Sequence, residues 1–217
     1  MPARRIGREA VRRIGLFGGS FDPPHLAHLA LARLAQQVLA LDELRWLPAG
    51  APWQKAGRQM ASSAHRAAML AALLQAEPGH RIDTRELDRG GPTYTIDTVR
   101  ELQAETPGAD WFFILGQDQY ARFDTWRDWP ELLQRLTLAV AARAGEAPAA
   151  PAALAAVPHR LVLLPLPRQD IAASDIRRQL ATGVRATGLA PLVGEAVASY
   201  IDHHQPYTRG DAQGIRH

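Results

Sequence analysis

The chain contains 217 residues, of which 47% are hydrophobic and 22% charged, and this composition disfavours collagen-like, coiled-coil and disordered architectures. Its formal charge is +3, but residues 14–217 carry 20 basic and 21 acidic side chains, so no nucleic-acid partner is expected for the body of the chain. The absence of cysteine excludes disulfides, thiolate metal sites and cysteine nucleophiles, and favours the reducing cytoplasm as the location.

The first 12 residues are rich in arginine and contain a single acidic residue, Glu9. Arginine-rich starts also occur in transit peptides and export signals, but the apolar stretch that follows, residues 14–17, is too short for the hydrophobic region of such a signal. We expect residues 1–12 to form a flexible, solvated arm, residues 13–207 a single domain and residues 208–217 a flexible tail. No stretch approaches the ~20 apolar residues of a membrane span, so no membrane partner is expected.

Short strand-like runs alternate with segments of helical periodicity along the rest of the chain. The predicted strands are residues 14–17, 43–47, 80–85, 111–115, 137–141 and 161–164. The predicted helices are residues 25–40, 63–74, 95–104, 174–180 and 192–204, with Ser63 expected to cap the second. Residues 145–158 are rich in alanine and proline and are expected to form a surface excursion with one helical turn.

This alternation predicts an α/β fold with a doubly wound, mostly parallel sheet and C-terminal helices, because parallel strands need helical crossovers. Sheets of this kind bind ligands beyond the carboxyl ends of their strands. Unusual residues stand at these positions: residues 18–28 follow the first strand, residues 48–55 the second, and residues 116–118 the strand that ends at Leu115. We therefore expect the binding site at these loops.

The loop after the first strand reads Gly-Gly-Ser-Phe-Asp-Pro-Pro-His-Leu-Ala-His from Gly18 to His28. Its two glycines permit a tight turn and close approach of the backbone to a ligand. Asp22 is a suitable N-cap and Pro24 suits the first helical position, so the free amides of the next helix would face the loop. His25 and His28 would lie on one helical face at this positively polarised end. Two imidazole donors beside free amides predict a phosphate site.

Other readings of this loop stay open. Neither the Gly-x-Gly-x-x-Gly fingerprint nor the Walker lysine pattern is present. A histidine pair three residues apart also occurs in metal sites, but the sequence offers no third ligand at a matching spacing, so no protein-bound metal is expected. The two histidines would otherwise be structural residues of the helix.

These residues also resemble a known superfamily. The pattern Gly-x-Phe-x-Pro-x-His-x-x-His, which ends at His28, resembles the signature of nucleotidyltransferases related to class I aminoacyl-tRNA synthetases. Gly-Pro-Thr-Tyr-Thr-Ile-Asp-Thr at residues 91–98, Gly-Gln-Asp at 116–118 and Trp126 are similar to marks of the bacterial nicotinate-nucleotide adenylyltransferase family. Ile-Ala-Ala-Ser-Asp-Ile-Arg at residues 171–177 resembles the superfamily's Ile-Ser-Ser-Thr-x-Ile-Arg stretch. Several motifs in the same order are far more specific than any one of them.

The resemblance implies a Rossmann-like enzyme that transfers the adenylyl group of ATP to nicotinate mononucleotide, giving nicotinate adenine dinucleotide and pyrophosphate in NAD biosynthesis. His25 and His28 would be the catalytic residues. The implied ATP-binding residues are Gly18, Gly19, Ser20, Phe21, His25, His28, Gly116, Asp118, Ser174, Ile176 and Arg177. The implied mononucleotide-binding residues are Lys55, Tyr94, Thr95, Asp118 and Trp126. Mg²⁺ is expected to arrive with ATP, because the sequence shows no obvious carboxylate cage.

On the mononucleotide side, the resemblance implies that Trp126 stacks on the pyridine ring, while the Tyr94-Thr95 segment meets its carboxylate. Trp126 would otherwise be a hydrophobic plug beside Trp129, and Thr95 a helix cap. Lys55, the only lysine of the chain, would face a phosphate or be an ordinary surface charge.

On the ATP side, Ser174 is expected to cap a helix whose amides meet a phosphate beside the guanidinium of Arg177. The alternative is a plain solvated helix start. Asp118 would contact ribose hydroxyls or be a turn residue.

The chain departs from the family pattern at three positions. Ala172 and Ala173 stand where hydroxyl residues are usual, and Gln54 replaces a histidine. Two alternatives therefore stay beside the implied activity. One is an adenylyltransferase for another acceptor, nicotinamide mononucleotide or phosphopantetheine, and the other is a non-catalytic nucleotide sensor.

Overall fold

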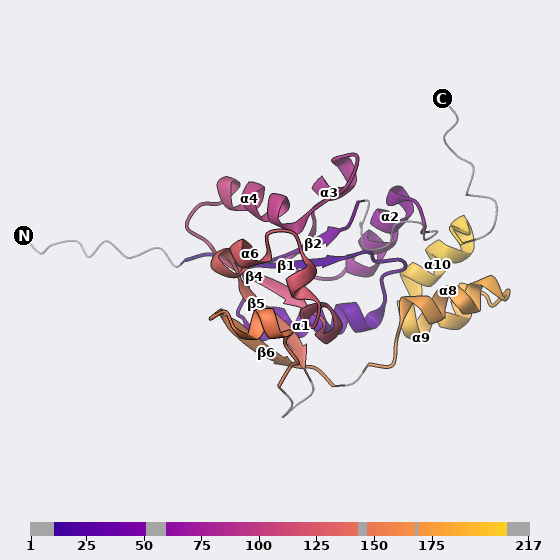
Figure 1. Cartoon of the computed structure of the whole chain (residues 1–217). Helices are drawn as coiled ribbons and strands as arrows, with labels where there is room; N and C mark the ends of the chain where they lie inside the picture. The colour runs from indigo at the N-terminus through magenta and orange to yellow at the C-terminus, as the bar shows by residue number, and fades with distance from the viewer. Residues whose placement is uncertain (1–10, 51–59, 143–146, 168, 208–217) are drawn as a thin grey trace, which may run out of the picture.

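The computed structural model describes residues 11–50, 60–142, 147–167 and 169–207 (Figure 1). Within these residues, six parallel strands form one sheet in the order β3-β2-β1-β4-β5-β6. The strands are β1 (Arg13–Gly19), β2 (Glu43–Pro48), β3 (His80–Ile82), β4 (Asp110–Leu115), β5 (Thr137–Ala142) and β6 (Leu161–Pro165). The chain runs outward from β1 to β3 and then returns to continue from β4 to β6 on the other side of β1. The predicted doubly wound parallel sheet is confirmed.

Helices follow the strands as crossovers. The longer ones are α1 (Leu26–Val38), α2 (Ser63–Leu74), α4 (Thr95–Glu105), α6 (Trp129–Arg135), α8 (Ala173–Ala181) and α10 (Glu195–His204). Single turns are α3 (Arg85–Asp88), α5 (Gln117–Tyr120), α7 (Ala152–Ala155) and α9 (Ala190–Val193), with 3-10 turns η2 (Phe123–Thr125) and η3 (Ala186–Leu189).

The sheet is covered on both faces, and each face has its own hydrophobic core. Figure 1 shows α4 and α6 on one side of the sheet and α1 on the other. One core packs the buried face of α1 with α2 and the C-terminal helices. The second packs α4 and α6 against the opposite side of β1, β4 and β5. Because the central strands are buried on both faces, β4 reads as an unbroken apolar run, Trp-Phe-Phe-Ile-Leu.

Several element boundaries differ from those predicted, for local reasons. The predicted strand 80–85 ends at Ile82, because the carboxylate of Asp83 accepts the backbone N–H of Arg85 at 3.2 Å and turns the chain into α3. Ser62, not Ser63, caps α2 and accepts from the N–H of His65 at 3.2 Å. The predicted helix 192–204 is broken into α9 and α10 at Gly194, which has a φ of 87°.

The alanine- and proline-rich excursion contains the predicted helical turn, α7. Leu154 on this turn is fully buried in the core under α4 and α6, so the described part of the excursion packs onto the domain. The sequence did not indicate this anchor, because a single leucine among alanines carries no periodicity.

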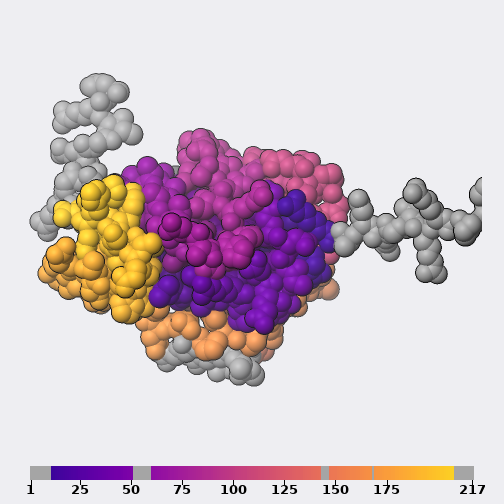
Figure 2. Space-filling view, turned by 180° about the vertical axis from the view of Figure 1, so that it is seen from behind, coloured from indigo at the N-terminus to yellow at the C-terminus, as the bar shows by residue number. Residues whose placement is uncertain are grey.

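The C-terminal helices pack at one end of the molecule. Figure 2 shows the yellow segment of α10 against the purple segment of α2, and Val197 and Ile201 of α10 belong to the same core as Met69 and Leu70 of α2. The described helices include none that is long and apolar enough to cross a membrane. Residues 1–10 of the predicted arm, which spans residues 1–12, and the whole predicted tail, residues 208–217, are outside the described residues.

Candidate active site

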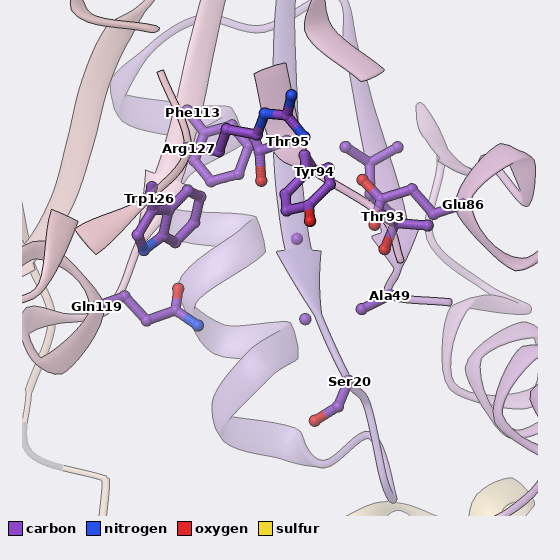
Figure 3. Close-up of a pocket in the computed structure, with 13 residues that line it drawn as sticks. Ser20, Ala49, Glu86, Thr93, Tyr94, Thr95, Phe113, Gln119, Trp126 and Arg127 are labelled. Carbon is purple, nitrogen blue, oxygen red and sulfur yellow. The ribbon is translucent and has the colours of Figure 1, made fainter. Parts of the chain in front are cut away.

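The carboxyl ends of β1 and β4 lie side by side where the sheet changes its direction of winding. Ligands bind at such a switch point in open α/β sheets. A pocket opens here (Figure 3). It is lined by Gly18, Gly19, Ser20, Leu47, Ala49, Glu86, Thr93, Tyr94, Thr95, Phe113, Gln119, Trp126 and Arg127. The structure thus brings together six of the predicted site residues, three from the ATP set and three from the mononucleotide set.

An aromatic wall closes one side of the pocket. The indole of Trp126 stacks on Phe123 with ring centroids 5.2 Å apart and meets the edge of Phe113 at 5.6 Å. Trp126 is therefore both a packed residue, as the alternative reading held, and a half-buried wall of the pocket. Its contacts fix the plane of the indole, which suits it to stack on a flat ring.

The N-terminus of α4 forms another part of the wall. Tyr94 is the N-cap residue with extended backbone angles, and Thr95 is the first helical residue. The alternative reading of Thr95 as a helix cap is therefore wrong. Both residues line the pocket, so the first free amides of α4 lie at its edge.

The two histidines stand at the start of α1, beside the pocket but outside its lining. Their rings stack with centroids 3.6 Å apart and an interplanar angle of 27°. Neither Asp22 nor Pro24 plays the expected part at this helix start. The helix begins at Leu26 with His25 as the N-cap, and the Asp22-Pro23 peptide bond before it is cis.

A hydrogen bond fixes the tautomer of His28. The backbone N–H of His25 donates to Nδ1 of His28 at 3.2 Å, so in the neutral ring the proton sits on Nε2. The His28 ring also packs edge-on against Phe21, with centroids 5.2 Å apart. Phe21, predicted as an ATP contact, thus orients His28. The first turn of α1 contains no acidic residue, so nothing there neutralises its positive end.

His25 is nearly inaccessible to solvent. Burial lowers the pKa of its imidazole to about 4, so the ring is neutral at pH 7. Its Nδ1 is buried without a hydrogen-bond partner in the described part of the chain. A neutral ring with a free nitrogen beside a stacked donor is suited to contact a ligand oxygen or a bridging water.

Asp22 is a buried connector rather than a cap. Its carboxylate accepts the backbone N–H of Ala61 at 3.2 Å and the hydroxyl of Tyr207 at 3.0 Å. It also lies 3.5 Å from the guanidinium of Arg177, which in addition donates to the Asp22 carbonyl. The side chain is 3% exposed, so its charge depends on these partners.

Arg66 joins the loops that follow β1 and β2. It is 1% exposed and donates to the carbonyls of Ser20 at 2.9 Å and Ala49 at 2.8 Å. Arg66 also donates to the carbonyl of Gly50, in the loop after β2, at 3.3 Å. One buried guanidinium thus shapes two loops that line the pocket. No sequence pattern indicated this role, because Arg66 sits within a helical pattern.

The start of α8 differs from the prediction. The N-cap is Ala172, whose side chain cannot cap, and Ser174 is an exposed residue of the first turn. Ile176 is buried in the core. Only Arg177, held against Asp22, reaches the loop that carries the histidines. The helix begins at Ala173, after the extended N-cap Ala172, so Ser174 lies beyond the cap position.

The remaining predicted residues have varied positions. Gly116 follows β4 and is the N-cap of α5, while Asp118 is exposed and outside the pocket lining. Lys55 and Gln54 lie outside the described residues. The binding roles of all these residues stay predictions.

Sequence reasoning missed several residues of the pocket wall. Thr93 lies within the 91–98 motif and Arg127 follows Trp126, so both were within reach of the motif analysis. Glu86 had no signal, because it lies just beyond the predicted strand 80–85, where the sequence predicted no helix. Its carboxylate accepts from the Thr98 hydroxyl at 2.9 Å, and burial raises its pKa.

The described residues include no group of three or more His, Cys, Asp or Glu side chains that could hold a metal ion. The stacked histidines accordingly have no third protein ligand in that part of the chain.

Comparisons with known proteins identify the family of this chain. A family model described as Cytidylyltransferase-like matches residues 16–179. A probable nicotinate-nucleotide adenylyltransferase of Methylibium petroleiphilum is 52% identical over 197 residues, which cover 90% of this chain and 92% of that protein. A protein of Bordetella petrii with the same description is 49% identical over 91% of this chain and 100% of its own length.

Solved structures show the same fold. The structure of Plasmodium falciparum nicotinic acid mononucleotide adenylyltransferase complexed with NaAD matches with a TM-score of 0.72 at 18% identity. The match covers 90% of this chain and 97% of that one. The sequence relatives and the family model together show that this chain belongs to the cytidylyltransferase-like proteins and, among them, to the nicotinate-nucleotide adenylyltransferase family.

Proposed function

We propose that this protein transfers the adenylyl group of ATP to nicotinate mononucleotide and releases pyrophosphate. The observation that carries the proposal is the 52% identity, over 90% of the chain, to a relative described as a probable nicotinate-nucleotide adenylyltransferase. The site supports it, because a loop suited to phosphate adjoins a pocket with an indole wall at the switch point of the sheet. The cytoplasmic location expected from the cysteine-free composition is part of this proposal.

The reaction is a displacement at phosphorus. A phosphate oxygen of the mononucleotide forms a bond to the α-phosphorus of ATP, and the bond from that phosphorus to the bridging oxygen breaks. Pyrophosphate leaves with the electron pair. The attacking phosphate has a second pKa near ~6 and is largely dianionic at neutral pH, so no protein base is required. Catalysis then consists of in-line positioning and stabilisation of charge.

The donors at the start of α1 provide that stabilisation. The Nε2–H of His28 and the free amides of the first turn of α1 bind oxygens of the triphosphate. Arg177 lies against the histidine loop and adds a fixed positive charge, while Lys55 is expected to face a phosphate. Mg²⁺ enters as part of the MgATP substrate.

An acceptor panel tests the proposal. Purified protein is incubated with MgATP and, in separate reactions, nicotinate mononucleotide, nicotinamide mononucleotide or phosphopantetheine, and pyrophosphate release is measured. The highest kcat/KM is expected with nicotinate mononucleotide. Preference for another acceptor would reassign the substrate. ATP binding without pyrophosphate release from any mixture would instead favour the nucleotide sensor, which the alanines at positions 172 and 173 make a real alternative.

A further inference from the structure

Arg127 is the only cationic residue among the described residues that line the pocket. The other strongly ionisable residue of that lining is Glu86, whose carboxyl group is buried and already accepts from Thr98. A substrate that carries a ring carboxylate brings a further negative charge into this space. The lining therefore offers a single side chain that can balance it.

The position of Arg127 directs it to the aromatic end of the pocket. Its guanidinium carbon lies 4.5 Å from the centre of the Tyr94 ring, and Figure 3 shows the group next to that ring. Arg127 follows Trp126, the residue expected to stack on the pyridine ring. Tyr94 in turn is the N-cap of α4, whose free amides adjoin the same space. A guanidinium and a helix start thus converge beside the expected site of the ring.

The guanidinium is available to a ligand. Arg127 makes no hydrogen bond to another residue in the part of the chain that the structure describes. Its ion pair with Asp128 spans 3.8 Å between Nε and Oδ2, and both side chains are at least half exposed, so that pair contributes little. The Tyr94 ring supports the face of the guanidinium, while its N–H groups point outward in the plane of the group.

We propose that Arg127 determines acceptor specificity by binding the carboxylate of nicotinate mononucleotide. A guanidinium donates two parallel charge-assisted hydrogen bonds to a carboxylate. A carboxamide offers only one neutral acceptor oxygen, and its N–H donors cannot pair with the N–H donors of the arginine. Arg127 therefore favours the acid over the amide. This inference rests on the proposed function and identifies one residue that selects the substrate of that reaction.

The test compares the two mononucleotides on one variant. With saturating MgATP, Arg127→Gln should lower kcat/KM for nicotinate mononucleotide by about 10-fold and change that for nicotinamide mononucleotide by less than about 2-fold, because only the acid loses a charge-assisted hydrogen bond. The KM for ATP should not change. Arg122→Gln is the matched control: it removes the same charge from an exposed residue of the same segment that does not line the pocket.

Two results would overturn the inference. An equal fall in kcat/KM for both acceptors would mean that Arg127 binds the phosphate that they share. Unchanged kcat/KM values for both acceptors would mean that the helix start alone selects the acid. If the wild-type protein releases no pyrophosphate with either acceptor, the proposed function fails, and calorimetric titration of both mononucleotides into the wild type and Arg127→Gln still decides the role of Arg127.

Discussion

At the scale of single residues, His28 is the hydrogen-bond donor on which the proposed catalysis most depends. Its Nδ1 is occupied by the N–H of His25, so Nε2 is the nitrogen that donates outward. Its ring is held by His25 on one side and by Phe21 on another. A donor held in this way needs no reorganisation when charge develops on a phosphate oxygen.

Replacing His28 should therefore affect catalysis far more than folding. His28→Ala is expected to lower kcat by about 100-fold, the effect of removing one positioned donor from a developing charge. Steady-state pyrophosphate release measures this loss, and urea unfolding checks that the fold is intact. His203→Ala, at an exposed position on α10, is the control and should keep full activity. Near-normal turnover of His28→Ala would remove His28 from the mechanism.

His25 makes a different contribution, which appears as a dependence of stability on pH. Burial holds the pKa of His25 near about 4 in the folded protein, below its unfolded value of 6.5. The unfolded chain therefore binds an extra proton between these two values, and stability falls as the pH falls through this window.

Between pH 7 and pH 5, this difference should cost the folded state about 2 kcal/mol. Urea unfolding of the wild type and His25→Gln over this pH range measures the effect, since the variant lacks the titrating ring. The free energy of unfolding of the wild type should fall more steeply. Parallel pH profiles for the two proteins would show that His25 is not the group responsible.

At the scale of elements, α3 and α4 are joined under the pocket by a buried polar contact. The Thr98 hydroxyl donates to Glu86 at 2.9 Å and accepts from Arg89 at 3.2 Å. Thr98 is fully buried and Glu86 is 8% exposed. Because burial already raises the pKa of Glu86, loss of a donor there is costly.

Thr98→Val keeps the shape of the side chain and removes the hydroxyl. We expect it to lower the free energy of unfolding by about 1–3 kcal/mol, because Glu86 loses a buried hydrogen bond. Thr98→Ser, which retains the hydroxyl and loses a methyl group, should be less destabilised in the same urea titration. The opposite order of the two variants would show that packing of the methyl group, not the hydrogen bond, joins these helices.

At the scale of the whole molecule, Asp22 joins segments that are far apart in sequence. The loop after β1, the segment before α2, the helix α8 and the residues after α10 all meet at its carboxylate. Tyr207 reaches it from 185 positions away. The C-terminal helices are thus connected directly to the loop that carries the histidines.

Tyr207→Phe removes only the hydroxyl of this connection. It should lower the free energy of unfolding by about 1–2 kcal/mol, because a buried carboxylate loses one of its donors. Tyr200→Phe is the matched control, since its hydroxyl contacts the half-buried His65 at 3.0 Å and its loss should cost less. Equal stability of Tyr207→Phe and the wild type would mean that Asp22 is satisfied without Tyr207.

The sequence by itself determined the parallel sheet, its strands and the loops that carry chemistry, because hydrophobic periodicity and glycine-rich turns are local signals. It also indicated the family through ordered motifs. The sequence was misleading where the residue type alone suggested a helix cap. Asp22 and Ser174 are residue types that commonly cap helices, yet the cap residues are His25 and Ala172.

Only the tertiary structure decided which side chains meet. Arg66 and Glu86 lie in ordinary-looking segments, and their roles arise from burial and from neighbours distant in sequence. The role of Asp22 as a buried connector also depends on distant residues, since its partners Tyr207 and Arg177 lie far from it in the sequence. Local patterns record the conformation that a segment prefers, whereas the charges and donors of a site are brought together by packing of the whole sheet and its helices.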